Sequence, residues 1–144
     1  IEKSVTLETA IDGHLPLLRA DRQRILQVLL NLLSNACKFT EEGYIMVSAS
    51  QRGDEVEISI QDTGPGIDED EQTSVFEAFK QSKSGLRQGG GTGLGLPISR
   101  SLAEAHGGRL WFESTVGKGS TFFVRIPVKS ETLTPVAGVV EAAK

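Results

Sequence analysis

Two asparagines one helical turn apart, followed by a lysine and a phenylalanine, are the residues of this chain whose types and spacing best suit chemistry. They lie in the segment Asn31-Leu-Leu-Ser-Asn35-Ala-Cys-Lys38-Phe39. At about 100° per residue, Asn31, Asn35 and Lys38 fall on one stripe of a helix. Amide oxygens suit Mg²⁺ where phosphates supply the negative charge, and an ammonium group attracts phosphate. An ordinary polar helix face is the competing interpretation, and this helix alone does not decide between the two.

A carboxylate followed by two glycines forms the second candidate group. Asp62 follows a predicted strand and precedes Gly64 and Gly66. Glycine lets a ligand approach the backbone closely, and a carboxylate accepts a hydrogen bond from an adenine amino group. An ordinary Asp-Thr-Gly turn would explain the same residues without any ligand.

A glycine-rich segment runs directly into a predicted helix. Gly89-Gly-Gly-Thr-Gly-Leu-Gly95 precedes Leu96, and the N–H groups at a helix N-terminus are donors for phosphate. The segment matches neither the dinucleotide-binding pattern, which needs a strand directly before it, nor the P-loop, which ends in Gly-Lys-Ser/Thr. Gly117-Lys-Gly119-Ser is a weaker signal, and a hairpin turn is its simplest interpretation.

The remaining aromatic and histidine residues give less specific signals. Phe76-Glu-Ala-Phe79 predicts a hydrophobic anchor for an irregular segment, although two aromatics there would also suit docking to a partner or closure over a ligand. His14 and His106 lack the neighbouring groups of a nucleophilic site, so neither is expected to be catalytic. His106 precedes Gly107 and suits a helix C-terminus, where a partial negative charge favours it.

The elements that position these groups follow from hydrophobic periodicity and turn signals. Asp21 is a plausible N-cap for a helix that runs to about Phe39, with Gly43 ending the element. The face of this first helix that should be buried consists of Ile25, Leu29, Leu32, Leu33 and Ala36. A second helix is predicted over about 96–106. Strands are predicted over 4–10, 17–20, 44–51, 55–61, 109–114 and 121–127. This order predicts a two-layer α/β sandwich, a mixed sheet with its helices on one face.

Composition limits the class of protein. The chain has 144 residues, of which 38% are hydrophobic and 24% charged, as in one soluble domain over residues 1–129 with a linker or tail over 130–144. The net charge of −4 does not favour a nucleic-acid or anionic-membrane surface. The longest apolar stretch is far shorter than the roughly 20 residues of a membrane-spanning helix. With no signal peptide and with Cys37 as the single cysteine, the sequence predicts a cytoplasmic location.

The order and spacing of these segments resemble the catalytic and ATP-binding domain of bacterial sensor histidine kinases, within the superfamily that includes DNA gyrase, the Hsp90 chaperones and MutL. The resemblance covers about residues 4–128. It implies the Bergerat ATP-binding fold, with a mostly antiparallel sheet and about three helices on one face. The matching motifs are the N box at 31–39, the G1 box at 62–66, the F box at 76–79, the G2 box at 89–96 and the following glycine turn at 117–121.

The resemblance also implies roles for individual residues. Asn31 and Asn35 would hold Mg²⁺, Lys38 would meet phosphate, and these three would form the catalytic set. Residues 69–90 would form a lid over ATP, whose cation would be Lys80, Lys83 or Arg87, because relatives carry an arginine where this chain has Lys80-Gln81. Nucleotide contacts would come from Asn35, Lys38, Phe39, Asp62 at the adenine amino group, Gly64, Gly66, Ile67, Phe79, Gly91, Thr92, Gly93, Leu94, Gly95, Leu96 and Thr121.

The activity implied by the resemblance is transfer of the γ-phosphate of Mg·ATP to a histidine, as in two-component signal transduction. Hydrolysing relatives carry glutamate where Asn31 stands, and asparagine cannot accept a proton from water. Neither His14 nor His106 has the His-Glu/Asp context of the family's acceptor. The expected partners are therefore a separate dimerisation and phosphoacceptor domain of the same parent protein and a downstream response regulator.

The isolated domain is expected to be monomeric, without contact to nucleic acid or membrane. The resemblance is also compatible with the cytoplasmic part of a membrane-bound sensor. Two alternatives stay open. One is an ATP-hydrolysing clamp of the same superfamily, and the other is a non-catalytic nucleotide-binding signalling module.

Overall fold

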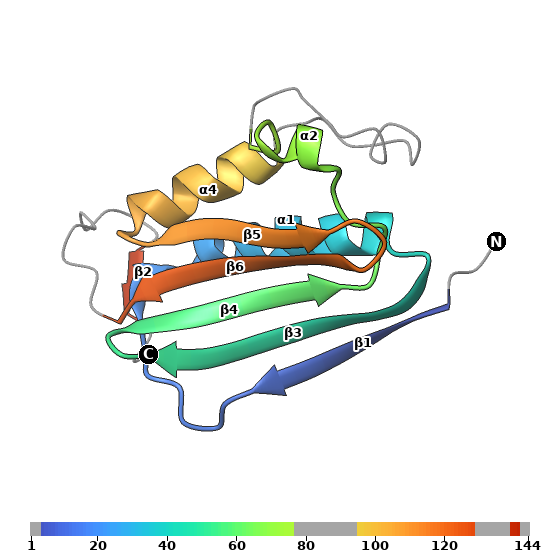
Figure 1. Cartoon of the computed structure of the whole chain (residues 1–144). Helices are drawn as coiled ribbons and strands as arrows, with labels where there is room; N and C mark the ends of the chain where they lie inside the picture. The colour runs from blue at the N-terminus through green and yellow to red at the C-terminus, as the bar shows by residue number, and fades with distance from the viewer. Residues whose placement is uncertain (1–3, 77–94, 129–138, 142–144) are drawn as a thin grey trace.

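A five-stranded sheet with the strand order β1-β3-β4-β6-β5 forms one layer, and the helices lie on one face of it (Figure 1). The computed structural model describes residues 4–76, 95–128 and 139–141. The strands are β1 (Ser4–Ile11), β3 (Glu42–Arg52), β4 (Glu55–Asp62), β5 (Arg109–Thr115) and β6 (Gly119–Pro127). β1 and β3 are parallel and the other pairs are antiparallel. The predicted two-layer sandwich with a mixed, mostly antiparallel sheet is confirmed.

The helix α1 (Arg22–Phe39) begins and ends where the sequence predicts, but Gly43 is not the residue that ends it. The side chain of Asp21 accepts the N–H of Arg24 at 3.2 Å and caps the first turn. At the other end Thr40 is extended and its N–H donates to the carbonyl of Ala36 at 3.1 Å, which closes the helix. Gly43 instead lies in β3 with a φ of +112°. The position requires glycine, because a Cβ there would collide with the Thr63 side chain.

The core lies between the sheet and the helices. The predicted buried stripe of α1 is nearly right, although Val28 is fully buried and Leu29 only half-buried. Inward-facing residues alternate along β4 and β6, as expected of strands with one covered face. The buried cluster consists of Val28, Leu32, Ala36, Ile45, Ile60, Ala103, Leu110, Phe122, Val124 and Ile126.

The helix α4 (Gly95–Ala105) packs against α1 and ends at two glycines, as predicted. Gly107 has a φ of +79°. Its N–H donates to Glu104 at 2.9 Å, and the N–H of Gly108 donates to Ala103 at 3.0 Å. This pair of bonds is a Schellman motif, which satisfies the last carbonyls of the helix.

Two short elements were not predicted from the sequence. The helix α2 (Glu69–Gln72) lies in the segment between β4 and α4. The strand β7 (Val139–Glu141), beyond Ser130, pairs antiparallel with β2 (Arg19–Asp21). Both are shorter than the window over which a hydrophobic period can be recognised. No helix in the described part of the chain is long and apolar enough to cross a membrane.

Candidate functional site

Asp62 is the last residue of β4, and its side chain is buried, with 7% of the residue exposed. Its Oδ1 accepts the N–H of Gly64 at 2.9 Å. Burial raises the pKa of Asp62 above its ordinary value, and hydrogen bonds from the backbone of Gly64 and Ser120 act in the opposite direction. A buried carboxylate with further lone pairs is a strong acceptor for a ligand N–H group.

The sheet register places two serines on the same face as Asp62. Asp62 is opposite Ser120, which is opposite Ser114 on β5, and the two serine Oγ atoms are 2.8 Å apart. Successive residues of a strand point to opposite faces, so the Thr121 side chain lies on the face without helices. Within this cluster Ser120, rather than Thr121, stands opposite Asp62, and the nucleotide contact of Thr121 stays a prediction. Since both residues carry a hydroxyl and follow the same glycine turn, the sequence could not distinguish them.

The two glycines after Asp62 are required by the protein's own backbone. A Cβ on Gly64 would lie 2.9 Å from the carbonyl oxygen of Phe39. Gly66 has a φ of +79°, and a Cβ there would collide with the carbonyl of Thr115. Gly64 therefore packs on the end of α1, and Gly66 packs on the end of β5. The sequence predicted close approach at these glycines but not which segments approach.

Asn31 joins α1 to the first turn of α4. Its Nδ2 donates to the Oγ of Ser99 at 3.1 Å and to the carbonyl of Gly95 at 3.4 Å. Both bonds use the amide nitrogen, so the amide oxygen takes no part in them. The N box and the end of the glycine-rich segment are thus adjacent. Ser99 is fully buried. Its contact with Asn31 could not be predicted from the sequence, because a serine inside an amphipathic helix does not stand out in the hydrophobic pattern.

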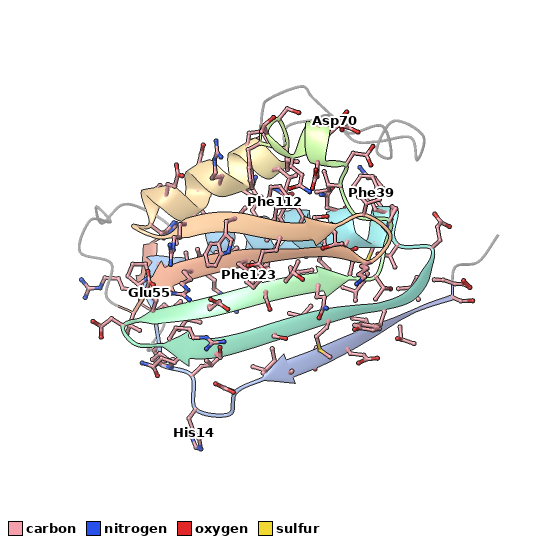
Figure 2. The ribbon with its side chains drawn as sticks, viewed as in Figure 1. His14, Phe39, Glu55, Asp70, Phe112 and Phe123 are labelled. Carbon is pink, nitrogen blue, oxygen red and sulfur yellow. The ribbon has the colours of Figure 1, made fainter. Side chains whose placement is uncertain are left out.

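Asn35, Lys38 and Phe39 continue along the second half of α1, and all three are half-buried. The Nζ of Lys38 lies 5.8 Å from the centroid of the Phe39 ring, within cation–π range. Figure 2 shows Phe39 toward the end of the sheet at which β4 finishes, the same end as Asp70. The predicted stripe of amides and a cation thus runs toward the residues that follow Asp62.

Ile67 and Leu96 both pack against the core, so their side chains fix the loop after Asp62 and the first turn of α4. The N–H of Ile67 donates to the Oγ of Ser114 at 2.8 Å, and its carbonyl accepts from Gln72 at 2.9 Å. Phe79, Gly91, Thr92, Gly93 and Leu94 lie outside the described residues, as do the lid residues 77–90 with Lys80, Lys83 and Arg87.

Phe76, the first residue of the F box, is a hydrophobic anchor, as predicted. It packs against the core, and its ring centroid lies 5.9 Å from that of Phe112 on β5. The guanidinium of Arg100 on α4 lies 4.5 Å from the centroid of the Phe76 ring. This cation–π contact holds the Phe76 ring beside α4.

His106 is structural. It is 2% exposed, its Nε2 accepts the N–H of Asp21 at 3.0 Å, and its Nδ1 lies 2.8 Å from the carbonyl of Leu102. The two contacts define a neutral ring with the proton on Nδ1, which links the end of α4 to the N-cap of α1. His14 is exposed at the edge of the molecule (Figure 2). Neither histidine lies in the cluster around Asp62 and Asn31.

The oxygen donors of α1 fit a magnesium ion that is held mainly by phosphates. Asn31 and Asn35 offer neutral amide oxygens beside the positive charge of Lys38, and Mg²⁺ commonly takes few protein ligands and keeps its phosphates and waters. In the described part of the chain, Asp68, Asp70 and Glu71 form a second set of possible ligands, whose carboxylate oxygens lie within 4.8 Å of one another. These carboxylates sit at the start of α2, where acidic side chains favour the helix N-terminus without any metal.

Comparison with known proteins identifies the family of this chain. Residues 20–130 match the family described as histidine kinase-, DNA gyrase B-, and HSP90-like ATPase. The chain is 45% identical over 128 residues to the circadian input-output histidine kinase CikA of Synechococcus elongatus, covering 88% of this chain and 17% of that protein. It is 44% identical over 142 residues to the sensor protein TorS of Escherichia coli, covering 98% of this chain and 15% of TorS. The chain thus spans less than a fifth of the length of these curated relatives.

Solved structures show the same fold. Full-length ShkA in complex with AMPPNP superposes with a TM-score of 0.75 at 36% identity, over 94% of this chain and 27% of that one. The nucleotide-free catalytic domain of the histidine kinase ThkA superposes with a TM-score of 0.74 at 32% identity, over 88% of this chain and 82% of that one.

Proposed function

Because the chain belongs to the family of histidine kinase-, DNA gyrase B- and HSP90-like ATPases, we propose that it is the ATP-binding catalytic part of a protein-histidine kinase. It binds Mg·ATP and donates the γ-phosphate to a histidine on a separate dimerisation and phosphoacceptor domain of its parent protein. A response regulator then receives the phosphoryl group. Relatives that are named histidine kinases support the transfer chemistry, and the AMPPNP in the ShkA structure supports the nucleotide.

The observation that carries the proposal is the meeting of three distant segments around the second half of α1. Gly64, two residues after Asp62, packs on the carbonyl of Phe39, and Asn31 donates to the carbonyl of Gly95 at 3.4 Å. A buried carboxylate, two amides and a lysine are therefore held on one framework. Such a combination suits a ligand with an amino-bearing base at one end and a metal-bound triphosphate at the other.

Each residue of the site has a distinct task in this proposal. Asp62 accepts a hydrogen bond from the adenine amino group. Asn31 and Asn35 hold the metal ion, which when bound supplies neutralisation of the phosphate charge, and Lys38 adds a point charge. Asn31 has no basic group that could take a proton from water, so the domain positions ATP without activating a hydrolytic nucleophile. Its contribution to transfer is positioning and charge neutralisation.

Calorimetric titration of two variants tests the assignment. We expect Asp62→Asn to weaken ATP binding at least tenfold, about 1.4 kcal/mol, with or without Mg²⁺, because the acceptor for the base amino group is lost. We expect Asn35→Ala to reduce the gain in affinity that Mg²⁺ provides.

The matched control is Asp54→Asn, which makes the same chemical change just before the other end of β4. It should bind ATP as the unmodified chain does. Unchanged titrations for both site variants would rule out the assignment.

A further inference from the structure

The hydroxyl of Ser114 lies where β5 meets the Asp62 loop, which we define as residues 63–67. Its Oγ accepts the N–H of Ile67 at 2.8 Å, lies 2.8 Å from the Oγ of Ser120 and donates to the carbonyl of Gly119 at 3.2 Å. A serine hydroxyl has one donor and two acceptor sites. With Ser120 donating to it, all three sites of Ser114 are used.

The Asp62 loop contacts the β5–β6 connection at two further places, both through the backbone. The N–H of Gly117 donates to the carbonyl of Pro65 at 2.8 Å. Gly66 packs directly against the carbonyl of Thr115. The position of the loop is therefore coupled to that of the β5–β6 connection, and Ser114 supplies the side-chain part of this coupling.

We infer that Ser114 is a positioning residue for nucleotide binding, which acts by holding the N–H of Ile67 and with it the Asp62 loop. The inference rests on the proposed function, in which Asp62 contacts the base. Residues 63–66 have no strand or helix of their own, so a lost anchor widens the range of loop conformations. A ligand that needs one of these conformations then binds more weakly, in proportion to the population that remains.

The effect should be specific to the base end of the ligand. Ser114 contacts the loop after Asp62, whereas the amides that would hold the metal are on α1 and contact α4. Ser114→Ala should therefore weaken ATP and ADP by the same factor and leave the dependence on Mg²⁺ unchanged. A single neutral hydrogen bond corresponds to about a three- to tenfold loss of affinity.

The experiment is a titration of the full chain and its variants with ATP and ADP, with and without Mg²⁺. Ser114→Ala should show the equal loss for both nucleotides. Ser114→Thr, which keeps the hydroxyl and suits a strand, should restore affinity. Ser59→Ala is the matched control, because it removes a half-buried serine hydroxyl on β4 whose side chain is on the other face of the sheet.

Hydrogen exchange gives a second readout that does not depend on how well the alanine variant folds. In the unmodified chain the Ile67 amide should be protected, and it should be more protected when ADP is added. Rapid exchange of this amide would overturn the inference. So would wild-type affinity in Ser114→Ala, a loss that Ser114→Thr does not restore, or a changed Mg²⁺ dependence. Absence of nucleotide binding by the unmodified chain would instead contradict the proposed function itself.

Discussion

At the scale of single residues, Asp62 is a buried carboxylate. Burial of its negative charge lowers the stability of the fold, while the same charge makes the side chain a good acceptor for a ligand N–H group. Burial raises its pKa above the ordinary value of 3.8, so the folded chain holds this proton more tightly than the unfolded chain does. The contribution of Asp62 to stability therefore falls as the pH rises through the window above 3.8. At neutral pH the charged side chain is a net cost that the fold tolerates.

Asp62→Asn should therefore separate stability from binding. We expect its thermal midpoint at pH 7.5 to be equal to or above that of the unmodified chain, while ATP affinity falls. Differential scanning calorimetry beside the ATP titration measures both quantities. A lowered midpoint would mean that the carboxylate stabilises the fold, contrary to the direction of its pKa.

The same pKa direction predicts a pH dependence of binding. Protonated Asp62 loses a lone pair needed for the base amino group, so adenosine affinity should weaken as the pH is lowered from 7.5 toward the raised pKa. Adenosine is the suitable probe because it carries no phosphate that titrates near neutrality. Asp62→Asn should lack this part of the dependence, and an identical pH profile in both proteins would contradict the prediction.

Gly66 and Gly53 allow a matched test of backbone packing. Both have positive φ, +79° and +63°, but a Cβ would meet the Thr115 carbonyl at Gly66 and nothing within 4 Å at Gly53. Gly53→Ala should cost about 1 kcal/mol of unfolding free energy through its conformation alone. Gly66→Ala should cost more than Gly53→Ala, about 2–3 kcal/mol, and also weaken ATP binding, because the Asp62 loop must move. Equal losses in denaturant unfolding would show that the Thr115 contact is unimportant.

At the scale of elements, the sequence predicted nearly all strands and both long helices, because their period and caps are local properties. The hairpin around Gly53 and the helix end at Gly107 were correct for this reason. The predicted end of α1 near Phe39 was correct, but Gly43 does not terminate the helix, because it packs against Thr63, a residue distant in sequence. Likewise the pairing of Ser120, rather than Thr121, with Asp62 depends on the register between β4 and β6. Such choices are made by tertiary contacts and leave little local signal.

The link between α1 and α4 gives a prediction at the same scale. His106→Ala removes the partner of the Asp21 N–H. It also leaves a cavity in place of the imidazole ring, because His106 is only 2% exposed. We expect a loss of about 2–4 kcal/mol of unfolding free energy, from a lost hydrogen bond to a buried group and from the cavity. His14→Ala, an exposed position, should stay within about 0.5 kcal/mol of the unmodified chain. Urea unfolding compares them, and similar small losses would contradict a structural role for His106.

At the scale of the whole molecule, the candidate site is assembled from segments 31–39, 62–67 and 95–99 along one side of the sheet. The sequence identified these segments through their residue types, and the structure adds Ser99, Ser114 and Ser120, which join them. The predicted roles of Asn31, Asn35, Lys38 and Asp62 remain proposals. The phosphoacceptor on another domain likewise remains part of the proposal.

The most direct test of the central claim is phosphorus NMR of Mg·ATP mixed with the chain and followed for several hours. A kinase domain without its acceptor should perturb the ATP resonances while no inorganic phosphate peak grows. A phosphate peak that grows with the unmodified chain but not with Asn35→Ala would contradict the claim in favour of an ATPase. Unperturbed resonances would contradict it in favour of a module that does not bind ATP.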